Sequence, residues 1–225
     1  MKTWDYYGKR DPYYGVLSAD EFRSGRMDAG ARQRFFDSGE EQVKQFVAIA
    51  EESFGALKHG TALDYGCGVG RLTRALAGRF ERVIAVDISS DMLAEAQRNL
   101  ADRQNVHYEQ AGAMGADAAD FLMSKIVFQH VKPALGLSIL GTLAQRLSER
   151  GVGVIDVPVA YAGGLLRRSL RALRPAWRFG EPVIPMSVYE LDQLEATLRA
   201  AGVRQVHVRK VAAPPFEKAI LSFCR

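Results

Sequence analysis

A glycine turn, Gly66-Cys67-Gly68-Val69-Gly70, joins a short apolar run to a segment whose apolar residues recur at helical spacing. Glycine tolerates positive φ and lets a backbone lie against a ligand. The free N–H groups at the start of the following helix add partial positive charge. Taken alone, the same turn also serves as a plain strand-to-helix connection, so a binding site needs support from further residues.

Two carboxylates supply that support. Asp64 comes just before the first glycine, and Asp87 ends a second apolar run about twenty residues later, where an acid typically hydrogen-bonds ribose hydroxyls. NAD and FAD are disfavoured, because Arg71 stands where a dinucleotide site has its third glycine and Asp64 would repel a pyrophosphate. A ligand with an adenosine half and an ammonium half suits this turn, and S-adenosylmethionine has that shape and charge.

Together these segments resemble the first two motifs of the class I S-adenosylmethionine-dependent methyltransferases. The resemblance rests on Asp64 with the glycine turn and on the stretch Val86-Asp87-Ile88-Ser89-Ser90-Asp91-Met92-Leu93, and it covers roughly residues 55–160. It implies S-adenosylmethionine as cofactor, with Asp87 on the ribose and Ile88 on the adenine face. The other cofactor-binding residues that it implies are Asp64, Tyr65, Gly66, Cys67, Gly68, Gly70, Met92, Met114, Phe128 and Gln129.

The contact to the adenine amino group departs from the family pattern. The family places an acid shortly after its third strand, predicted here at 105–110, but residues 111–115 intervene before Asp117. Asp117 could reach the adenine from a shifted loop, backbone groups could replace it, or cofactor affinity could be modest. Ile88 and Met114 either sandwich the adenine ring or pack as ordinary apolar residues.

Two residues are candidates for catalysis. His130 follows the strand predicted at 121–127, whose tip the resemblance places beside the reactive methyl; it is either a general base or bonded to the backbone. Asp156 lies near the end of the strand predicted at 151–158, and it either accepts a proton from a substrate hydroxyl or binds a neighbouring loop. Methyl transfer requires no metal and no covalent intermediate, so orientation and exclusion of water can supply most of the rate.

Composition fits a single α/β domain of 225 residues with 48% apolar content. Its net charge of +4 comes without the clustering of a committed nucleic-acid binder, and we expect no DNA partner. The two cysteines, Cys67 and Cys224, indicate neither a disulfide framework nor a zinc site. With no apolar leader and no long apolar run, we expect a cytoplasmic protein without a membrane span.

Strands alternating with helices predict a Rossmann-like, doubly wound and mostly parallel sheet. The resemblance implies seven strands with an antiparallel hairpin at the C-terminal edge. We expect a cofactor-binding core at 38–159, opened by a helix that Ser38 caps together with Glu41, and a C-terminal helix and edge strands at 187–225, where Ser187 caps the helix.

Two further segments are predicted to lie outside the core. Residues 1–37 form an aromatic arm without regular periodicity, which either covers a pocket or packs on the core. Residues 160–186 form a lid insertion whose arginines recur at helical spacing, at Arg167, Arg171, Arg174 and Arg178. That basic face is solvated, contacts an anionic substrate, or attaches to an acidic membrane surface.

The resemblance favours O-methylation of a small hydroxylated metabolite or saccharide, and the acceptor could be anionic. Family members that methylate nucleobase amines carry an Asn/Asp-Pro-Pro-Tyr/Phe loop, which is replaced here by Phe128-Gln129-His130-Val131. The arm and lid resemble those of small-molecule and saccharide methyltransferases. Two alternatives remain open: methylation of a protein or RNA partner, and a cofactor-binding scaffold without turnover. The sequence does not indicate an oligomeric state.

Overall fold

The computed structural model describes residues 3–161, 177–178 and 180–225. Its central sheet contains five parallel strands, which are β1 (Thr61–Tyr65), β2 (Arg82–Asp87), β3 (Val106–Gln110), β4 (Ala119–Ser124) and β5 (Leu147–Tyr161). Two antiparallel strands, β8 (Gln205–Ala213) and β9 (Phe216–Cys224), complete the order β3-β2-β1-β4-β5-β9-β8. The predicted doubly wound sheet of seven strands, with its antiparallel edge hairpin, is confirmed.

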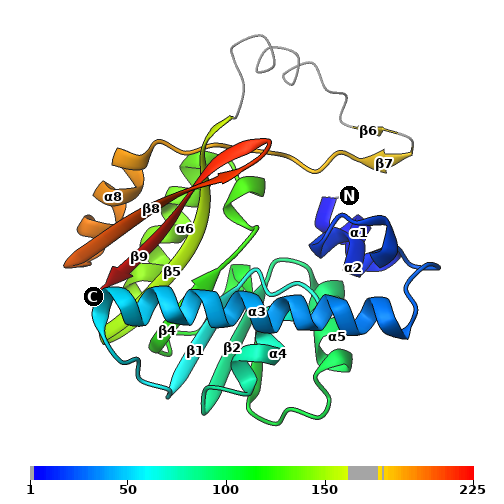
Figure 1. Cartoon of the computed structure of the whole chain (residues 1–225), viewed down its shortest axis with the longest axis horizontal. Helices are drawn as coiled ribbons and strands as arrows, with labels where there is room; N and C mark the ends of the chain where they lie inside the picture. Colours follow the sequence, from blue (N-terminus) through cyan, green and yellow to red (C-terminus); the bar gives the residue numbers. More distant parts are fainter. Residues whose placement is uncertain (1–2, 162–176, 179) are drawn as a thin grey trace.

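Helices cover both faces of this sheet (Figure 1). They are α1 (Thr3–Arg10), α2 (Pro12–Val16), α3 (Ala29–Phe54), α4 (Arg71–Ala77), α5 (Ser90–Asn99), α6 (Pro133–Gln145) and α8 (Leu191–Ala200). Alternate residues of β1 show the two layers, because Ala62 is buried with side chains of α3 and α4 whereas Leu63 is buried with side chains of α6 and α8. Strands buried on both faces read as continuous apolar runs, which explains why the sequence predicted them well.

The remaining elements are short. They are the 3₁₀ turns η1 (Asp20–Phe22), η2 (Ala111–Ala113) and η3 (Phe128–His130), and a separate hairpin of β6 (Trp177–Arg178) and β7 (Glu181–Pro182). In Figure 1 this hairpin lies next to α1 and α2, although the two regions stand at opposite ends of the sequence. In the part of the chain that the structure describes, no helix has the length and apolar character needed to cross a membrane.

The predicted start of the first long helix is wrong. Helix α3 begins at Ala29, where the Asp28 carboxylate accepts a hydrogen bond from the Ala31 N–H at 2.7 Å. Ser38 lies inside this helix, and its hydroxyl donates to the Phe35 carbonyl at 2.6 Å. The arm is also more regular than predicted, since it contains α1, α2 and η1. Its aromatic residues are buried on more than one side, which hid the helical period.

Other predicted boundaries also move, since β5 spans Leu147–Tyr161 rather than 151–158, and one prediction falls outside the described residues. Helix α8 begins at Leu191 after Glu190 rather than at Ser187, whose N–H instead donates to the Gln129 carbonyl at 2.7 Å. Strand β4 ends at Ser124, because the chain turns at Ile126, whose φ is +64°. Of the predicted arginine face, Arg167, Arg171 and Arg174 lie outside the described residues, as does the side chain of Arg178.

Candidate active site

A cavity of about 720 Å³ opens beyond the carboxyl ends of the central strands, where ligands bind in sheets of this type. Its volume is typical of small-molecule sites. The loops after β1, β2 and β4 contribute Gly66, Cys67, Gly68, Ile88, Lys125, Ile126 and Val127, and the strand ends contribute Tyr65 and Asp87. The N-terminal arm contributes Thr3, Trp4, Gly15 and Val16, and the segment after β7 contributes Pro185 and Ser187.

The glycine turn forms one wall of the cavity in a backbone conformation that favours glycine. Gly66 and Gly68 line the cavity with φ values of +79° and +53°. A Cβ on Gly66 would stand 2.2 Å from Val127 Cγ2, and one on Gly68 would stand 2.6 Å from Val16 Cγ2. Gly70, with φ +87°, does not line the cavity but is the N-cap residue of α4. Local packing requires glycine at this position. Glycine is therefore required in this turn, because a Cβ would clash with neighbouring side chains and because other residues adopt positive φ only with strain.

Asp87 lies where the sequence predicts a ribose contact. Its carboxylate lines the cavity; one oxygen accepts from the Gly68 N–H and the other from the Ser89 N–H, both at 2.9 Å. Burial raises the pKa of Asp87, whereas these backbone donors lower it. Because a carboxylate oxygen can accept more than one hydrogen bond, both oxygens retain capacity for ligand hydroxyls.

Asp64 is fully buried behind the glycine turn and does not line the cavity. One carboxylate oxygen accepts from the Thr73 hydroxyl at 2.7 Å, and the other has no partner among the described residues. Burial raises the pKa of Asp64 to about 6. The structure thus places this acid one layer away from the position that a direct contact with a ligand ammonium would need.

Arg71, the first residue of α4, faces the cavity instead. It is only 3% exposed, and one guanidinium nitrogen donates to the Ser38 hydroxyl at 3.0 Å. Its Nε has no hydrogen-bond partner in the described part of the chain. Burial lowers the pKa of Arg71 to about 10, so the side chain is charged at neutral pH. This end of the cavity therefore presents a buried cation, which the sequence signalled only as a departure from the dinucleotide pattern.

Only some of the residues predicted to lie near the adenine line the cavity. Ile88 lines the cavity with half of its side chain exposed, as a stacking surface for a ring requires, and Met92 lines it from α5. Met114 packs against the buried core instead. Asp117 is not a lining residue, because its carboxylate pairs with Arg82 at 2.6 Å. Of the alternatives for the adenine amino group, the shifted-loop role of Asp117 finds no support.

Tyr65 and Cys67 line the cavity as the resemblance implied, but Phe128 and Gln129 do not. Phe128 is buried in the core beside α8, with its ring 6.0 Å from that of Tyr189. The Gln129 side-chain amide contacts His130. The loop after β4 therefore supplies Lys125, Ile126 and Val127 to the cavity, three residues that the sequence predicts to lie within the strand.

His130 lines the cavity with both ring nitrogens engaged. Its Nδ1 donates to the Pro185 carbonyl at 2.8 Å, which leaves Nε2 as the acceptor for the Gln129 amide at 3.1 Å. Burial lowers the pKa of His130, so the ring is neutral at pH 7. Trp4 packs edge-on against it at a centroid distance of 5.2 Å. The structure thus contains one of the two predicted alternatives, a hydrogen bond from His130 to the backbone. His130 can abstract a proton only when the Gln129 amide releases Nε2.

Asp156 does not line the cavity. Its carboxylate accepts from the Ile126 N–H at 2.8 Å and pairs with Lys218 at 2.9 Å and Lys125 at 3.6 Å. The two lysines hold the pKa of Asp156 below its ordinary value despite complete burial. A carboxylate so fixed and so weakly basic is unsuited to proton abstraction. The structure instead fits the other alternative, a bond to a neighbouring loop.

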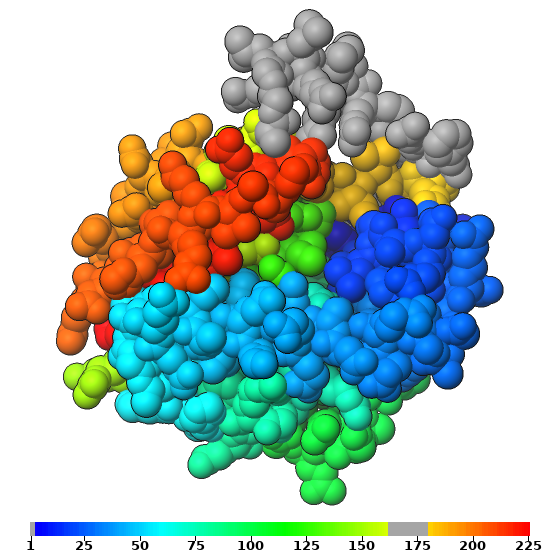
Figure 2. Space-filling model, in the orientation of Figure 1, coloured from blue at the N-terminus to red at the C-terminus, as the bar shows by residue number. Residues whose placement is uncertain are grey.

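The arm covers the cavity, as one of the two interpretations of its aromatic residues predicted. Tyr7 donates to the Pro182 carbonyl at 3.1 Å, and Arg23 binds Asp11 at 3.1 Å and Glu181 at 2.9 Å. In the space-filling view the arm, in blue, lies directly against the yellow segment that follows residue 180 (Figure 2). Arm and segment together close part of the cavity, and Val16 of the arm lies directly over the glycine turn at Gly68.

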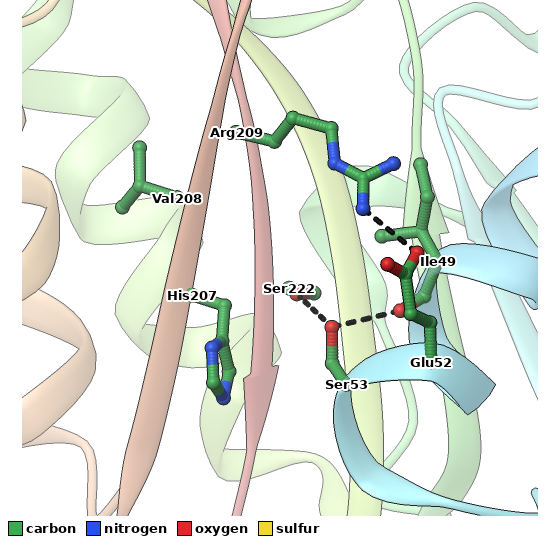
Figure 3. Close-up of a pocket in the computed structure, with 7 residues that line it drawn as sticks. All are labelled: Ile49, Glu52, Ser53, His207, Val208, Arg209 and Ser222. Atoms are coloured by element: carbon green, nitrogen blue, oxygen red, sulfur yellow. Dashed lines mark hydrogen bonds and ion pairs between the residues drawn. The ribbon is translucent and has the colours of Figure 1, made fainter.

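A second cavity, of about 290 Å³, lies between the end of α3 and the edge hairpin. Figure 3 shows Arg209 reaching across to Glu52, at 2.8 Å, and Ser53 beside Ser222, with their hydroxyl oxygens 3.1 Å apart. Because these polar groups already bind one another, the larger cavity is the candidate active site.

Residues 62–151 match a family model described as a methyltransferase domain. Over 97 residues the chain is 33% identical to trans-aconitate 2-methyltransferase of Afipia carboxidovorans, covering 42% of this chain and 37% of that protein. Over 150 residues it is 30% identical to malonyl-[acyl-carrier protein] O-methyltransferase of Salmonella typhimurium, covering 64% and 57%. The chain thus spans less than two thirds of the length of either relative.

Two solved structures share the fold over nearly the whole chain. Magnesium protoporphyrin IX methyltransferase from Synechocystis PCC 6803, with bound SAH, has a TM-score of 0.62 at 19% identity and covers 96% of this chain and 97% of its own. N-methyltransferase NodS from Bradyrhizobium japonicum, also with SAH, has a TM-score of 0.61 at 14% identity, covering 100% and 99%. The resemblance predicted from the sequence is confirmed by the domain match and by the fold.

Proposed function

We propose that this chain, which has a methyltransferase domain at residues 62–151 and the fold of the class I S-adenosylmethionine-dependent methyltransferases, transfers a methyl group from S-adenosylmethionine to a small molecule. One observation carries the proposal. A single cavity joins the glycine turn and Asp87 to an apolar end that contains Trp4 and His130. Cofactor and acceptor can therefore meet in one enclosed space, and the names of the two curated relatives, for trans-aconitate and malonyl-[acyl-carrier protein], support methylation outside nucleic acids.

The residues present fit the cofactor along the length of the cavity. Asp87 binds the ribose hydroxyls through its carboxylate, and Ile88 covers a face of the adenine. Arg71 and Lys125, two cations that line the cavity, bind the carboxylate of the methionine half, since charge-assisted hydrogen bonds are the strong ones. Asp64, behind the turn, attracts the ammonium through the field of its charge rather than by contact.

The acceptor atom that best fits this site is an oxygen that already carries a negative charge. A hydroxyl acceptor, which the sequence favoured, would need a base, yet His130 Nε2 is occupied by Gln129 and Asp156 is held by lysines. A carboxylate needs none. Lys132 lines the acceptor end of the cavity and supplies charge complementary to such a substrate. We therefore favour a small carboxylate over a neutral hydroxylated metabolite or saccharide.

With a carboxylate acceptor the step is an in-line displacement. The carboxylate oxygen forms a bond to the methyl carbon, the carbon–sulfur bond breaks, and sulfur keeps the electron pair, so the products are a methyl ester and S-adenosylhomocysteine. No proton moves. The contribution of the protein is alignment of the two reactants, together with exclusion of water by the arm and the segment after β7.

The test is release of S-adenosylhomocysteine from S-adenosylmethionine in the presence of acceptor panels. We expect turnover with small di- and tricarboxylates, and a rate that stays flat above the carboxylate pKa because no base titrates. Turnover only with sugars or phenols would contradict the carboxylate assignment. Turnover only with protein or RNA would favour the macromolecular alternative, and cofactor binding without any turnover would favour a scaffold.

A further inference from the structure

We propose that Asp156 is a positioning residue, whose carboxylate holds the backbone of Ile126 and thereby sets the wall of the cavity formed by the loop after β4. The inference rests on the proposed function for the identity of the ligand. It assigns a structural role to Asp156, which neither lines the cavity nor suits proton transfer.

Ile126 has a backbone conformation that its side chain opposes. Its φ of +64° lies in the left-handed region, which is unfavourable for residues branched at Cβ. Such a conformation persists only where the surroundings hold it, and strain of this kind gathers at functional sites. The turn ends β4 at Ser124 and directs Val127 back toward the glycine turn.

The Asp156 carboxylate is built to hold this turn. One oxygen accepts from the Ile126 N–H at 2.8 Å, and the acid is only 3% exposed. The other oxygen is fixed by Lys218 of β9 at 2.9 Å, with Lys125 at 3.6 Å. Both cations favour the ionised carboxylate, so Lys125 still does so when Lys218 is replaced, and a hydrogen bond to an ionised acceptor is about twice as strong as a neutral one.

The position of this loop determines the shape of the cofactor side of the cavity. Lys125, Ile126 and Val127 all line it. The space that a Cβ on Gly66 would need is filled by Val127 Cγ2, so loop and glycine turn are in direct contact. A shift of the backbone at Ile126 therefore moves both the loop and the glycine turn, which are the two walls between which the cofactor binds. Asp156 itself touches neither the cofactor nor the acceptor.

The experiment measures the affinity for S-adenosylhomocysteine by calorimetry in two variants, of which the second keeps the net charge of the wild type. Lys218→Met removes an ion pair and leaves the bond to Ile126 in place. Asp156→Ala with Lys218→Met removes one charge of each sign and also the bond. We expect Lys218→Met to bind within about threefold of the wild type and the double variant to bind at least about tenfold more weakly, the equivalent of one lost hydrogen bond.

A glycine at position 126 separates positioning from simple loss of stability. Because glycine adopts positive φ without strain, the turn no longer needs its tether. With Ile126→Gly present, we expect the addition of Asp156→Ala to Lys218→Met to change affinity less than about threefold. If the loss is the same with and without Ile126→Gly, or if no loss occurs, the proposal is wrong.

Asp156→Asn gives a second route if the alanine variants fail to fold, as circular dichroism would show. The asparagine oxygen can still accept from the Ile126 N–H, although more weakly than a carboxylate, so a loss of affinity smaller than about tenfold supports positioning, and a loss of tenfold or more overturns it. Failure of the wild-type protein to bind S-adenosylhomocysteine would instead contradict the proposed function, so the two failures are distinguishable.

Discussion

The floor and the roof of the cavity are held by different forces. The floor, which consists of the glycine turn 66–70, Asp87 and the loop 125–127, is fixed by backbone groups that bond to one another or to buried carboxylates. Gly66 and Cys67 donate to the Val86 carbonyl at 2.7 and 2.9 Å, and the Ile126 N–H donates to Asp156 at 2.8 Å. The roof, which consists of α1, α2 and residues 180–187, is joined by side chains. The Tyr7 hydroxyl, for example, donates to the Pro182 carbonyl at 3.1 Å, although the two residues are 175 positions apart in sequence.

This difference has a functional consequence. Buried backbone hydrogen bonds open only with extensive unfolding, whereas side-chain contacts between distant segments, such as the partly exposed pair of Arg23 and Glu181, open at lower free energy. The floor is therefore the permanent recognition surface, and the roof is the part that can admit and release ligands. Substitutions in the floor should abolish or weaken binding, and substitutions in the roof should alter access with smaller losses.

The largest effect is expected from Gly66→Ala. The new Cβ would stand 2.2 Å from Val127 Cγ2 in a backbone conformation with φ +79°, so the floor must distort where the cofactor lies. We expect S-adenosylmethionine binding to fall more than about 100-fold in calorimetry, a loss of about 3 kcal/mol. Gly55→Ala is the matched control, because φ is +82° there but nothing lies within 4 Å. Equal affinities of the two variants would contradict a contact between S-adenosylmethionine and the floor at Gly66.

Asp87→Ala tests the ribose contact in the floor. We expect binding to weaken by about 1–3 kcal/mol through the loss of charge-assisted hydrogen bonds. Asp117→Ala is the control, because Asp117 pairs with Arg82 outside the cavity and should leave affinity unchanged. Unchanged affinity in Asp87→Ala would contradict the ribose assignment, and weaker binding in Asp117→Ala would restore its role at the adenine.

Arg71→Met tests the cation at the amino-acid end of the floor. We expect affinity for S-adenosylhomocysteine to fall about tenfold, while affinity for methylthioadenosine, which lacks the amino-acid half, stays the same. Lys132→Met, at the acceptor end of the same cavity, should change neither cofactor affinity. A parallel loss for both ligands in Arg71→Met would show that Arg71 supports the fold of the site rather than the ligand carboxylate.

The smallest effect is expected in the roof, from Arg23→Met. Arg23 joins the arm to Glu181 at 2.9 Å with 28% of its side chain exposed, so its loss should cost about 1 kcal/mol or less. We expect faster proteolysis within the arm and cofactor affinity reduced less than about fivefold. Arg34→Met, which breaks the exposed pair with Glu21 in the same region, is the control. A loss as large as that of Gly66→Ala would abolish the distinction between floor and roof.

Two parts of the floor, the glycine turn and Asp87, could be predicted from the sequence because their determinants are local. Glycines at 66, 68 and 70 and an acid at 87 have their roles fixed by the strand and turn on which they stand. The sequence marks Asp156 as a candidate site residue and leaves a catalytic role open, because its lysine partner at 218 lies 62 residues away in sequence. The bend at Ile126 was missed for a similar reason, since an apolar, β-branched residue predicts a continuing strand.

The roof could not be predicted in the same way. Tyr7, Tyr13 and Phe35 are buried together with residues of the glycine turn and α5, so no single helical stripe marks an inner face. The contacts of Arg23 and Tyr7 reach residues more than 150 positions away, which sequence spacing does not encode. The aromatic content predicts an arm that either covers a pocket or packs on the core. Its helices, and the contacts of Tyr7 and Arg23 with Pro182 and Glu181, become visible only in the tertiary structure.

The most direct test of the account is calorimetric titration of the unmodified protein with S-adenosylmethionine and, separately, with NAD. The account predicts micromolar binding of S-adenosylmethionine and no detectable binding of NAD, because Asp87 offers a ribose contact while Arg71 replaces the glycine that a pyrophosphate site requires. Binding of NAD, or no binding of S-adenosylmethionine, would contradict it.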